Sequence, residues 1–218
     1  MRIALTVALT ACGVAFAPVS VAEPMGTCPP ACNRIPDSAW IATSAIPMES
    51  RYGWQPLAGL AVTAREPRFR FEELCGTPAP ASDPRGYSVA ERVVLTNPAG
   101  QWQLQAQILH WRGETWRGGE LARDALASAA AALRACQQTN PAASPSLTLD
   151  EPERLAAVIS GPVILHQYLL ADPVSSTVTE LALWVGAPPA AAYPTVADTA
   201  VLDALGTPLC SAYLGSCP

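Results

Sequence analysis

Lysine is missing from this sequence: all thirteen basic residues are arginine, and the formal net charge of the 218 residues is −5. Like charges never form a long block, and no basic stripe runs along any segment. Proteins that bind nucleic acids normally carry such a stripe, because contacts to phosphates supply much of their affinity. The composition therefore argues against a nucleic-acid partner.

Familiar catalytic motifs are missing as well. The sequence contains no GxSxG elbow, no HExxH helix, no P-loop and no GxGxxG fingerprint. It has two histidines, and neither lies near another metal ligand in the sequence. We therefore expect a protein that is not an enzyme, with no catalytic residue, no cofactor and no bound metal.

A secreted hydrolase with an unrecognised acid–base site is the alternative, because a pair of carboxylates suffices for glycoside hydrolysis. Several carboxylates are available, although nothing in the sequence brings two of them together. They include Glu72, Glu73, Glu114, Glu120 and Glu180.

Long apolar runs are confined to the amino terminus. Arg2 precedes the apolar run Ile3–Phe16, and the small residues of Ser20–Ala22 follow, as at a signal-peptide cleavage site. The later apolar stretch Leu155–Ala171 is interrupted by Gly-Pro and by a histidine, and is too short to span a bilayer. We predict a signal peptide over residues 1–22 and a mature chain without a transmembrane helix.

A lipid anchor is an alternative to free secretion. Leu9-Thr10-Ala11-Cys12 fits the lipobox pattern of bacterial lipoproteins. The apolar run continues past Cys12 to Phe16, however, whereas a tether is usually polar and flexible. We therefore expect a freely secreted or cell-envelope protein, with lipidation at Cys12 as the alternative.

Seven cysteines are present, and six remain once Cys12 leaves with the leader. These six are Cys28, Cys32, Cys75, Cys136, Cys210 and Cys217. An even set in an exported chain predicts structural disulfides, and the CxxxC spacing of the first two differs from the CxxC of redox centres. The connectivity that we favour pairs the two amino-terminal cysteines with the two carboxy-terminal ones, because domain termini often lie close together. Cys75 would then pair with Cys136.

Turn residues and hydrophobic periodicity predict a Pro-rich segment over residues 23–56, tied by disulfides, and a single domain over residues 57–218. The predicted strands are residues 57–63, 87–96, 101–111, 163–170 and 177–185, with an extended segment at 65–73. The predicted helices are residues 119–138 and 196–205, the second ending at Gly206, while 155–159 is a short helix or the start of a strand. Residues 75–85 and 140–146 are predicted loops.

The strand at 101–111 alternates strictly between glutamine and apolar residues, which predicts one solvated face and one core face. Hairpins with a helix between them indicate an α+β fold. We predict a mostly antiparallel sheet of about five to six strands, covered on one face by one long helix and one or two short helices, and stapled by disulfides.

Two histidines are candidate site residues. His110 and His166 each lie on the apolar face of a predicted strand, where packing is the ordinary interpretation. The functional interpretation is that they project into one cleft from two hairpins, where they could bind an anion or change charge near pH 6–7.

Aromatic and arginine residues cluster beside His110. Trp102, Trp111 and Trp116 lie close to Arg112 and Arg117 in the sequence. Core packing is again one interpretation; the other is a groove at the end of the hairpin, where rings stack on a sugar or an apolar ligand. We predict a ligand cleft formed by His110, Trp111, Arg112 and His166.

The chain resembles the extracellular sensor domains of mycobacterial receptor Ser/Thr kinases and the stand-alone exported proteins and lipoproteins related to them. The resemblance lies in the hairpin that carries Trp102, the alanine-rich helix that ends in Cys136, the strands from Val163 to Val185 and the cysteines at both ends. It implies an antiparallel sheet with helices beside it and a cleft for a ligand, in an actinobacterial exported protein. The kinase and its membrane helix are missing from this sequence, and the resemblance brings no catalytic residues.

These observations together predict a secreted cell-envelope module of the sensor-like kind, which binds a ligand or a partner without catalysis. The expected partner is a small apolar or glycan-like ligand, or an envelope protein. Besides the hydrolase, the remaining alternative is an exported structural protein that binds a partner through its surface.

Overall fold

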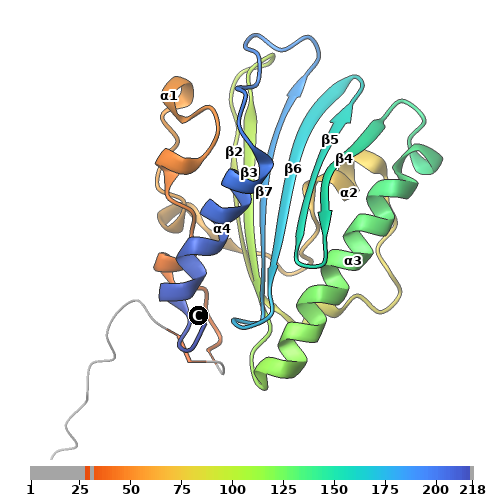
Figure 1. The fold of residues 1–218 in the computed structure, drawn as a ribbon. Coiled ribbons are helices and arrows are strands. Elements are labelled where there is room, and N and C mark those ends of the chain that lie inside the picture. Colours follow the sequence, from red (N-terminus) through yellow and green to blue (C-terminus); the bar gives the residue numbers. More distant parts are fainter. Residues whose placement is uncertain (1–27, 30–31, 217–218) are drawn as a thin grey trace, which may run out of the picture.

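A computed structural model describes residues 28–29 and 32–216 of the chain (Figure 1). The leader, Cys12 and Cys217 lie outside the described residues, so the predictions made for them stay predictions. The strands are β1 (Val62–Thr63), β2 (Val89–Leu95), β3 (Gln103–His110), β4 (Ser144–Glu151), β5 (Arg154–Ser160), β6 (Val163–Asp172) and β7 (Thr177–Gly186). The α-helices are α1 (Glu49–Tyr52), α2 (Arg70–Cys75), α3 (Thr115–Thr139) and α4 (Asp198–Ala212).

The strands form one antiparallel sheet of seven strands, in the order β1-β2-β3-β7-β6-β5-β4. Helices and sheet together make an α+β fold, which confirms the predicted class. The two predicted hairpins also form, since β2 pairs with β3 and β6 with β7.

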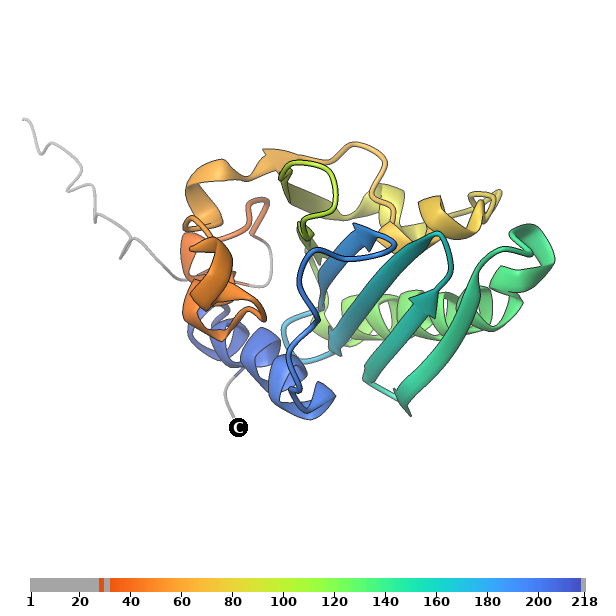
Figure 2. The same ribbon diagram turned by 90° about the horizontal axis from the view of Figure 1, so that it is seen from above.

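Both faces of the sheet are covered (Figure 1; Figure 2). Helices α2 and α3 pack on one face, where Leu109 and Leu165 are fully buried. Helix α4 and the amino-terminal segment pack on the other, where Leu104 and Leu181 are fully buried. Burial of apolar surface on both faces, at roughly 25 cal/mol per Å², is the main favourable contribution to folding.

The predicted solvated face of the sheet is therefore wrong. The alternation along β3 has the expected period, but Gln105 and Gln107 are 2% and 0% exposed. The start of α2 lies over this face of the sheet. The backbone N–H groups of Arg70 and Phe71 donate hydrogen bonds to the side chains of Glu180 and Gln167. The glutamines thus belong to a buried polar cluster.

The Pro-rich amino-terminal segment is part of the core. Two short 3₁₀ turns, Asp37–Ala39 and Thr43–Ala45, precede α1 in it, and a third, Ala58–Leu60, follows just after the segment. Its large apolar side chains are buried in the same core as residues of the sheet and α4; they include Ile35, Trp40, Ile46 and Trp54. In the described residues the segment is held by this packing and not by a disulfide to the rest of the domain.

The prediction of an extended segment over 65–73 is wrong at its end, because α2 begins at Arg70. The Glu72 carboxylate accepts a hydrogen bond from the Phe69 backbone N–H, which caps the helix, and Gly76 ends it in the left-handed region. Of the strand predicted at 57–63, Val62–Thr63 alone is extended in the sheet.

Two further boundaries differ from the predictions. The loop predicted at 140–146 ends early, because β4 begins at Ser144 and pairs with β5, so that 155–159 is strand. Helix α4 continues through Gly206 and Pro208 to Ala212. Leu209 is fully buried, so its packing outweighs the backbone hydrogen bond that a proline inside a helix removes.

The disulfides differ in part from the favoured connectivity. Cys75 is bonded to Cys136, as predicted, and this bridge joins α2 to α3. Cys28 is bonded to Cys32, so the cross-pairing with the carboxy-terminal cysteines is wrong; Cys210 is also disulfide-bonded. The two ends do lie together, but they are joined by backbone hydrogen bonds between Cys28 and the chain at residues 212–214.

The sheet has an irregular edge at β4. Pro145 lies in this strand and supplies no N–H to a further strand, and the register with β5 shifts between Leu147 and Leu149.

Candidate functional site

A groove at the carboxyl end of β3 is the candidate functional site. Its volume is about 530 Å³, within the range of roughly 300–1,000 Å³ that is typical of small-molecule sites. It lies between the 3₁₀ turn Pro84–Tyr87, the chain that leaves β3 and the first turns of α3. The lining side chains that matter below are Ser82, Pro84, Tyr87, Trp111, Arg112, Glu114 and Arg117.

The floor of the groove is built where β3 turns into α3. Trp111 is 3% exposed, and its indole N–H donates a hydrogen bond to the carbonyl oxygen of Pro84 at 3.0 Å. Gly113 has a φ of 109°, in the left-handed region that favours glycine, so the chain can turn sharply there. The two sides of the groove are therefore connected through Trp111.

The wall at residues 83–87 is held from inside by Arg85. Its guanidinium lies 2.8 Å from a Glu72 oxygen and 2.6 Å from an Asp83 oxygen, and over the ring of Phe69. Burial opposes the charge of Arg85, but the hydrogen bonds and charges of the two carboxylates outweigh burial and raise its pKa. Burial also acts against ionisation of Asp83, whereas hydrogen bonds from Arg85 lower its pKa. These charges satisfy one another and support the wall.

The charges at the opening of the groove are different. Arg112 and Arg117 are exposed, and neither forms an ion pair with a described residue. The Tyr87 side chain is 82% exposed. Among the described residues that line the groove, Glu114 is the one that carries a carboxylate, whereas the usual mechanism of glycoside hydrolysis needs two. This arrangement can hold an anionic group and stack on a ring.

His110 lies on the opposite face of the sheet from the groove, because successive side chains of a strand alternate. It is 1% exposed, its ring stacks on Tyr213 with centroids 4.6 Å apart, and Nδ1 lies 3.0 Å from the carbonyl oxygen of Ser175. His110 is thus a packed residue of the layer that contains α4.

His166 is also remote from the groove. Its ring stacks on Tyr193 at 3.5 Å between centroids, and burial lowers its pKa to about 4. His110 is paired with Thr177 and His166 with Leu183 of β7, six residues apart, which corresponds to about 20 Å. The structure therefore does not bring the two histidines into one cleft.

The aromatic and arginine cluster is brought together in part. Trp111, Arg112 and Arg117 line the groove. Trp102 is 1% exposed on the other face of the sheet, and Trp116 is 65% exposed in a shallow neighbouring hollow. The sequence predicts Tyr87 as the first residue of a strand, so its place in the groove was missed; its signal was an aromatic residue next to a glycine, directly after the Pro-rich loop at 75–85.

A second unexpected feature is a buried carboxylate in the middle of the sheet. Glu180 is 1% exposed, and it accepts hydrogen bonds from Gln105 and Gln167 at 3.0 Å and from the Arg70 backbone N–H at 2.6 Å. Burial raises its pKa to about 7, although these hydrogen bonds and the charge of Arg92 favour the ionised form. Because Glu180 is buried and held by these hydrogen bonds, we interpret it as a structural residue.

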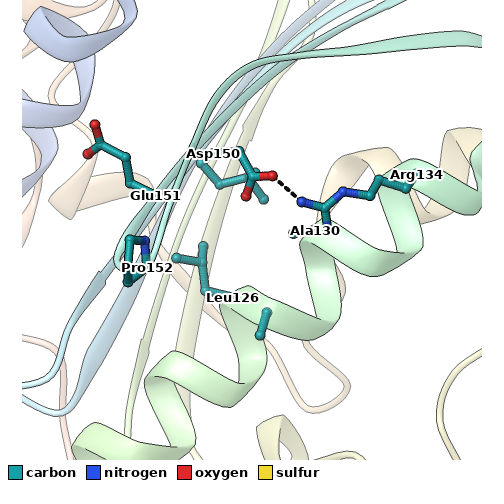
Figure 3. Close-up of a pocket in the computed structure, with 8 residues that line it drawn as sticks. Leu126, Ala130, Arg134, Asp150, Glu151 and Pro152 are labelled. Carbon is teal, nitrogen blue, oxygen red and sulfur yellow. Dashed lines mark hydrogen bonds and ion pairs between the residues drawn. The ribbon is translucent and has the colours of Figure 1, made fainter.

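A second hollow lies between α3 and the β4–β5 hairpin (Figure 3). Its volume is about 360 Å³, and Leu126, Ala130 and Leu155 form its apolar lining. Arg134 and Asp150 point toward one another across it and form an ion pair (Figure 3). These two charges pair with each other, and the remaining charged residue of the lining, Glu151, is a carboxylate, so this hollow suits an anionic ligand less than the groove does.

Comparisons of this chain with protein-family models, with curated proteins and with solved structures found no match. Among residues 28–29 and 32–216, no group of three or more His, Cys, Asp or Glu side chains is placed to hold a metal ion. No helix in the same ranges is both long enough and apolar enough to cross a membrane.

Proposed function

We propose that this protein is an exported, cell-envelope binding module of the sensor-like kind, without catalysis, and that its ligand lies in the groove at the end of β3. The ligand is a small glycan-like or apolar molecule that stacks on Tyr87 and contacts Trp111.

One observation carries the proposal: the groove presents an exposed aromatic ring beside two arginines that form no ion pair with any described residue, on a floor held by the Trp111 indole. Exposed aromatic rings and unpaired charges in a concave site are typical of ligand binding. The disulfides fit an exported protein, because such bonds persist outside the cytoplasm. The resemblance to kinase sensor domains stays a prediction that agrees with this role.

The test is titration of the ¹⁵N-labelled protein with cellotetraose, tetragalacturonate and 2-naphthol, followed by NMR. The indole N–H of Trp111 is the reporter, since its hydrogen bond to Pro84 joins the two sides of the groove. We expect at least one compound to shift this signal saturably.

Tyr87→Ala should weaken that binding, because it removes the exposed stacking surface. Trp116→Ala is the matched control, since it removes an exposed aromatic ring outside the groove. Lack of a saturable shift with all three compounds, or equal binding by Tyr87→Ala, would refute the proposal.

A further inference from the structure

We infer that the ligand of the groove is an acidic saccharide, whose carboxylate is bound by Arg112 and Arg117 while a sugar ring stacks on Tyr87. This inference rests on the proposed function and adds the chemical class of the ligand.

The first argument is the distribution of arginines. The described residues contain twelve arginines, and seven of them form ion pairs with carboxylates. The five that do not are Arg34, Arg51, Arg65, Arg112 and Arg117. Two of these five line a single groove. In a chain with a net charge of −5, two unpaired cations facing one cavity make a local site for an anion.

The second argument is the shape of the charged groups. A guanidinium is planar and presents its donors as a fork that matches the two oxygens of a carboxylate. Glu114 is the single carboxylate among the described lining residues, so the charged lining sums to +1 from Arg112, Arg117 and Glu114. One carboxylate of the ligand, placed between the two arginines, therefore brings the groove close to neutral.

The third argument favours a sugar as the scaffold of the acid. Tyr87 offers the face of an exposed ring, and rings of this type stack on the apolar face of a sugar. The Ser82 hydroxyl and the Glu114 carboxylate lie in the same lining and can bond to sugar hydroxyls. An apolar acid would leave both of these groups without a partner.

The fourth argument is that most of the groove is already fixed. The Trp111 indole is hydrogen-bonded to Pro84, and Arg85 is held by Glu72 and Asp83. Binding therefore needs to order few groups besides the two arginines and Tyr87, and this lowers its entropic cost.

The experiment compares tetragalacturonate with its methyl ester by isothermal titration calorimetry, because the two differ in the charge of the carboxyl groups. We expect the acid to bind at least ten-fold more tightly than the ester, and its affinity to fall as NaCl is raised. Arg112→Ala and Arg117→Ala should each weaken binding of the acid by about 10- to 100-fold, as expected for hydrogen bonds to a charged group.

Arg51→Ala is the matched control, since Arg51 is also exposed and forms no ion pair within residues 28–29 and 32–216, but lies on α1 and does not line the groove. It should bind the acid like the wild type. If acid and ester bind equally well and Tyr87→Ala weakens both, the inference is overturned and the proposed function stands. If neither the acid nor the ester binds while cellotetraose or 2-naphthol still shifts the Trp111 signal, the inference alone is overturned. If none of these compounds binds, or if Tyr87→Ala has no effect on any of them, both are overturned.

Discussion

Replacing Glu180 by glutamine is the sharpest test of the core described above. The carboxylate accepts hydrogen bonds from Gln105, Gln167 and the Arg70 N–H, and Gln107 lies 3.4 Å away. A glutamine has nearly the same size, so Glu180→Gln keeps the packing. It removes a proton-binding group whose pKa folding raises from 4.5 to about 7.

The sign and the size follow from that shift. A carboxylic acid with a raised folded-state pKa binds its proton more tightly in the folded protein than in the unfolded chain. Its contribution to the free energy of unfolding is therefore fully present below pH 4.5 and is lost as the pH rises through about 7. A shift of this size corresponds to about 3 kcal/mol in total, of which about 2–3 kcal/mol falls between pH 5 and pH 8.

The assay is urea unfolding at pH 5, 6, 7 and 8 with the disulfides intact, followed by tryptophan fluorescence. Between pH 5 and pH 8 the wild type should lose about 2–3 kcal/mol relative to Glu180→Gln, and other titrating groups cancel in that comparison. Glu66→Gln, at an exposed carboxylate, should follow the wild type. Parallel curves for wild type and Glu180→Gln, or a wild type that gains stability relative to this variant as the pH rises, would refute the reasoning.

Three further predictions concern stability. Because burial lowers the folded-state pKa of His166 to about 4, this residue should cost the wild type up to about 3 kcal/mol of unfolding free energy as the pH falls from 6.5 to about 4. His166→Phe should remove that loss, and equal pH curves for the two proteins in urea unfolding would contradict this. Gly119→Ala should destabilise by about 1–3 kcal/mol in thermal unfolding, since its Cβ would lie 2.6 Å from the Pro173 carbonyl oxygen, whereas Gly86→Ala should have little effect; an unchanged Tm for Gly119→Ala would count against the close packing. Replacing both Cys75 and Cys136 by alanine should cost about 2–4 kcal/mol, because a bridge across 61 residues is lost; a free energy of unfolding within about 0.5 kcal/mol of the wild type would argue against it.

The sequence predicted the strands with strong alternation and the long helix well. β2, β3, β6, β7 and α3 all lie where turn residues and periodicity placed them. These patterns depend on neighbours along the chain, which a single sequence contains. They do not show what lies over a strand.

The failures came from contacts between distant segments. Alternating glutamines normally indicate solvent, but Gln105 lies under α2, 35 residues earlier in the chain, and bonds to Glu180. The helix α4 likewise passes through Pro208 because Leu209 is buried by the sheet. In both cases tertiary packing outweighed local preference.

The prediction of the candidate site succeeded for residues that follow one another closely in the sequence. Trp111, Arg112 and Arg117 follow β3 and meet in the groove, whereas His166 comes from another strand and another face. Tyr87 joins the groove through the turn that Arg85 anchors from within. Nothing in the spacing of these residues along the chain indicates this meeting.

The irregular β4 edge has a consequence for how the protein behaves at high concentration. With both faces covered, one open route to sheet-mediated association is the addition of a strand to β4. Pro145 and the register shift between Leu147 and Leu149 interrupt the row of backbone donors and acceptors that a second chain would need. The irregularity at β4 therefore makes strand addition at this edge less favourable, and leaves the short β1 edge, the helical layers and the strand ends as surfaces for contact.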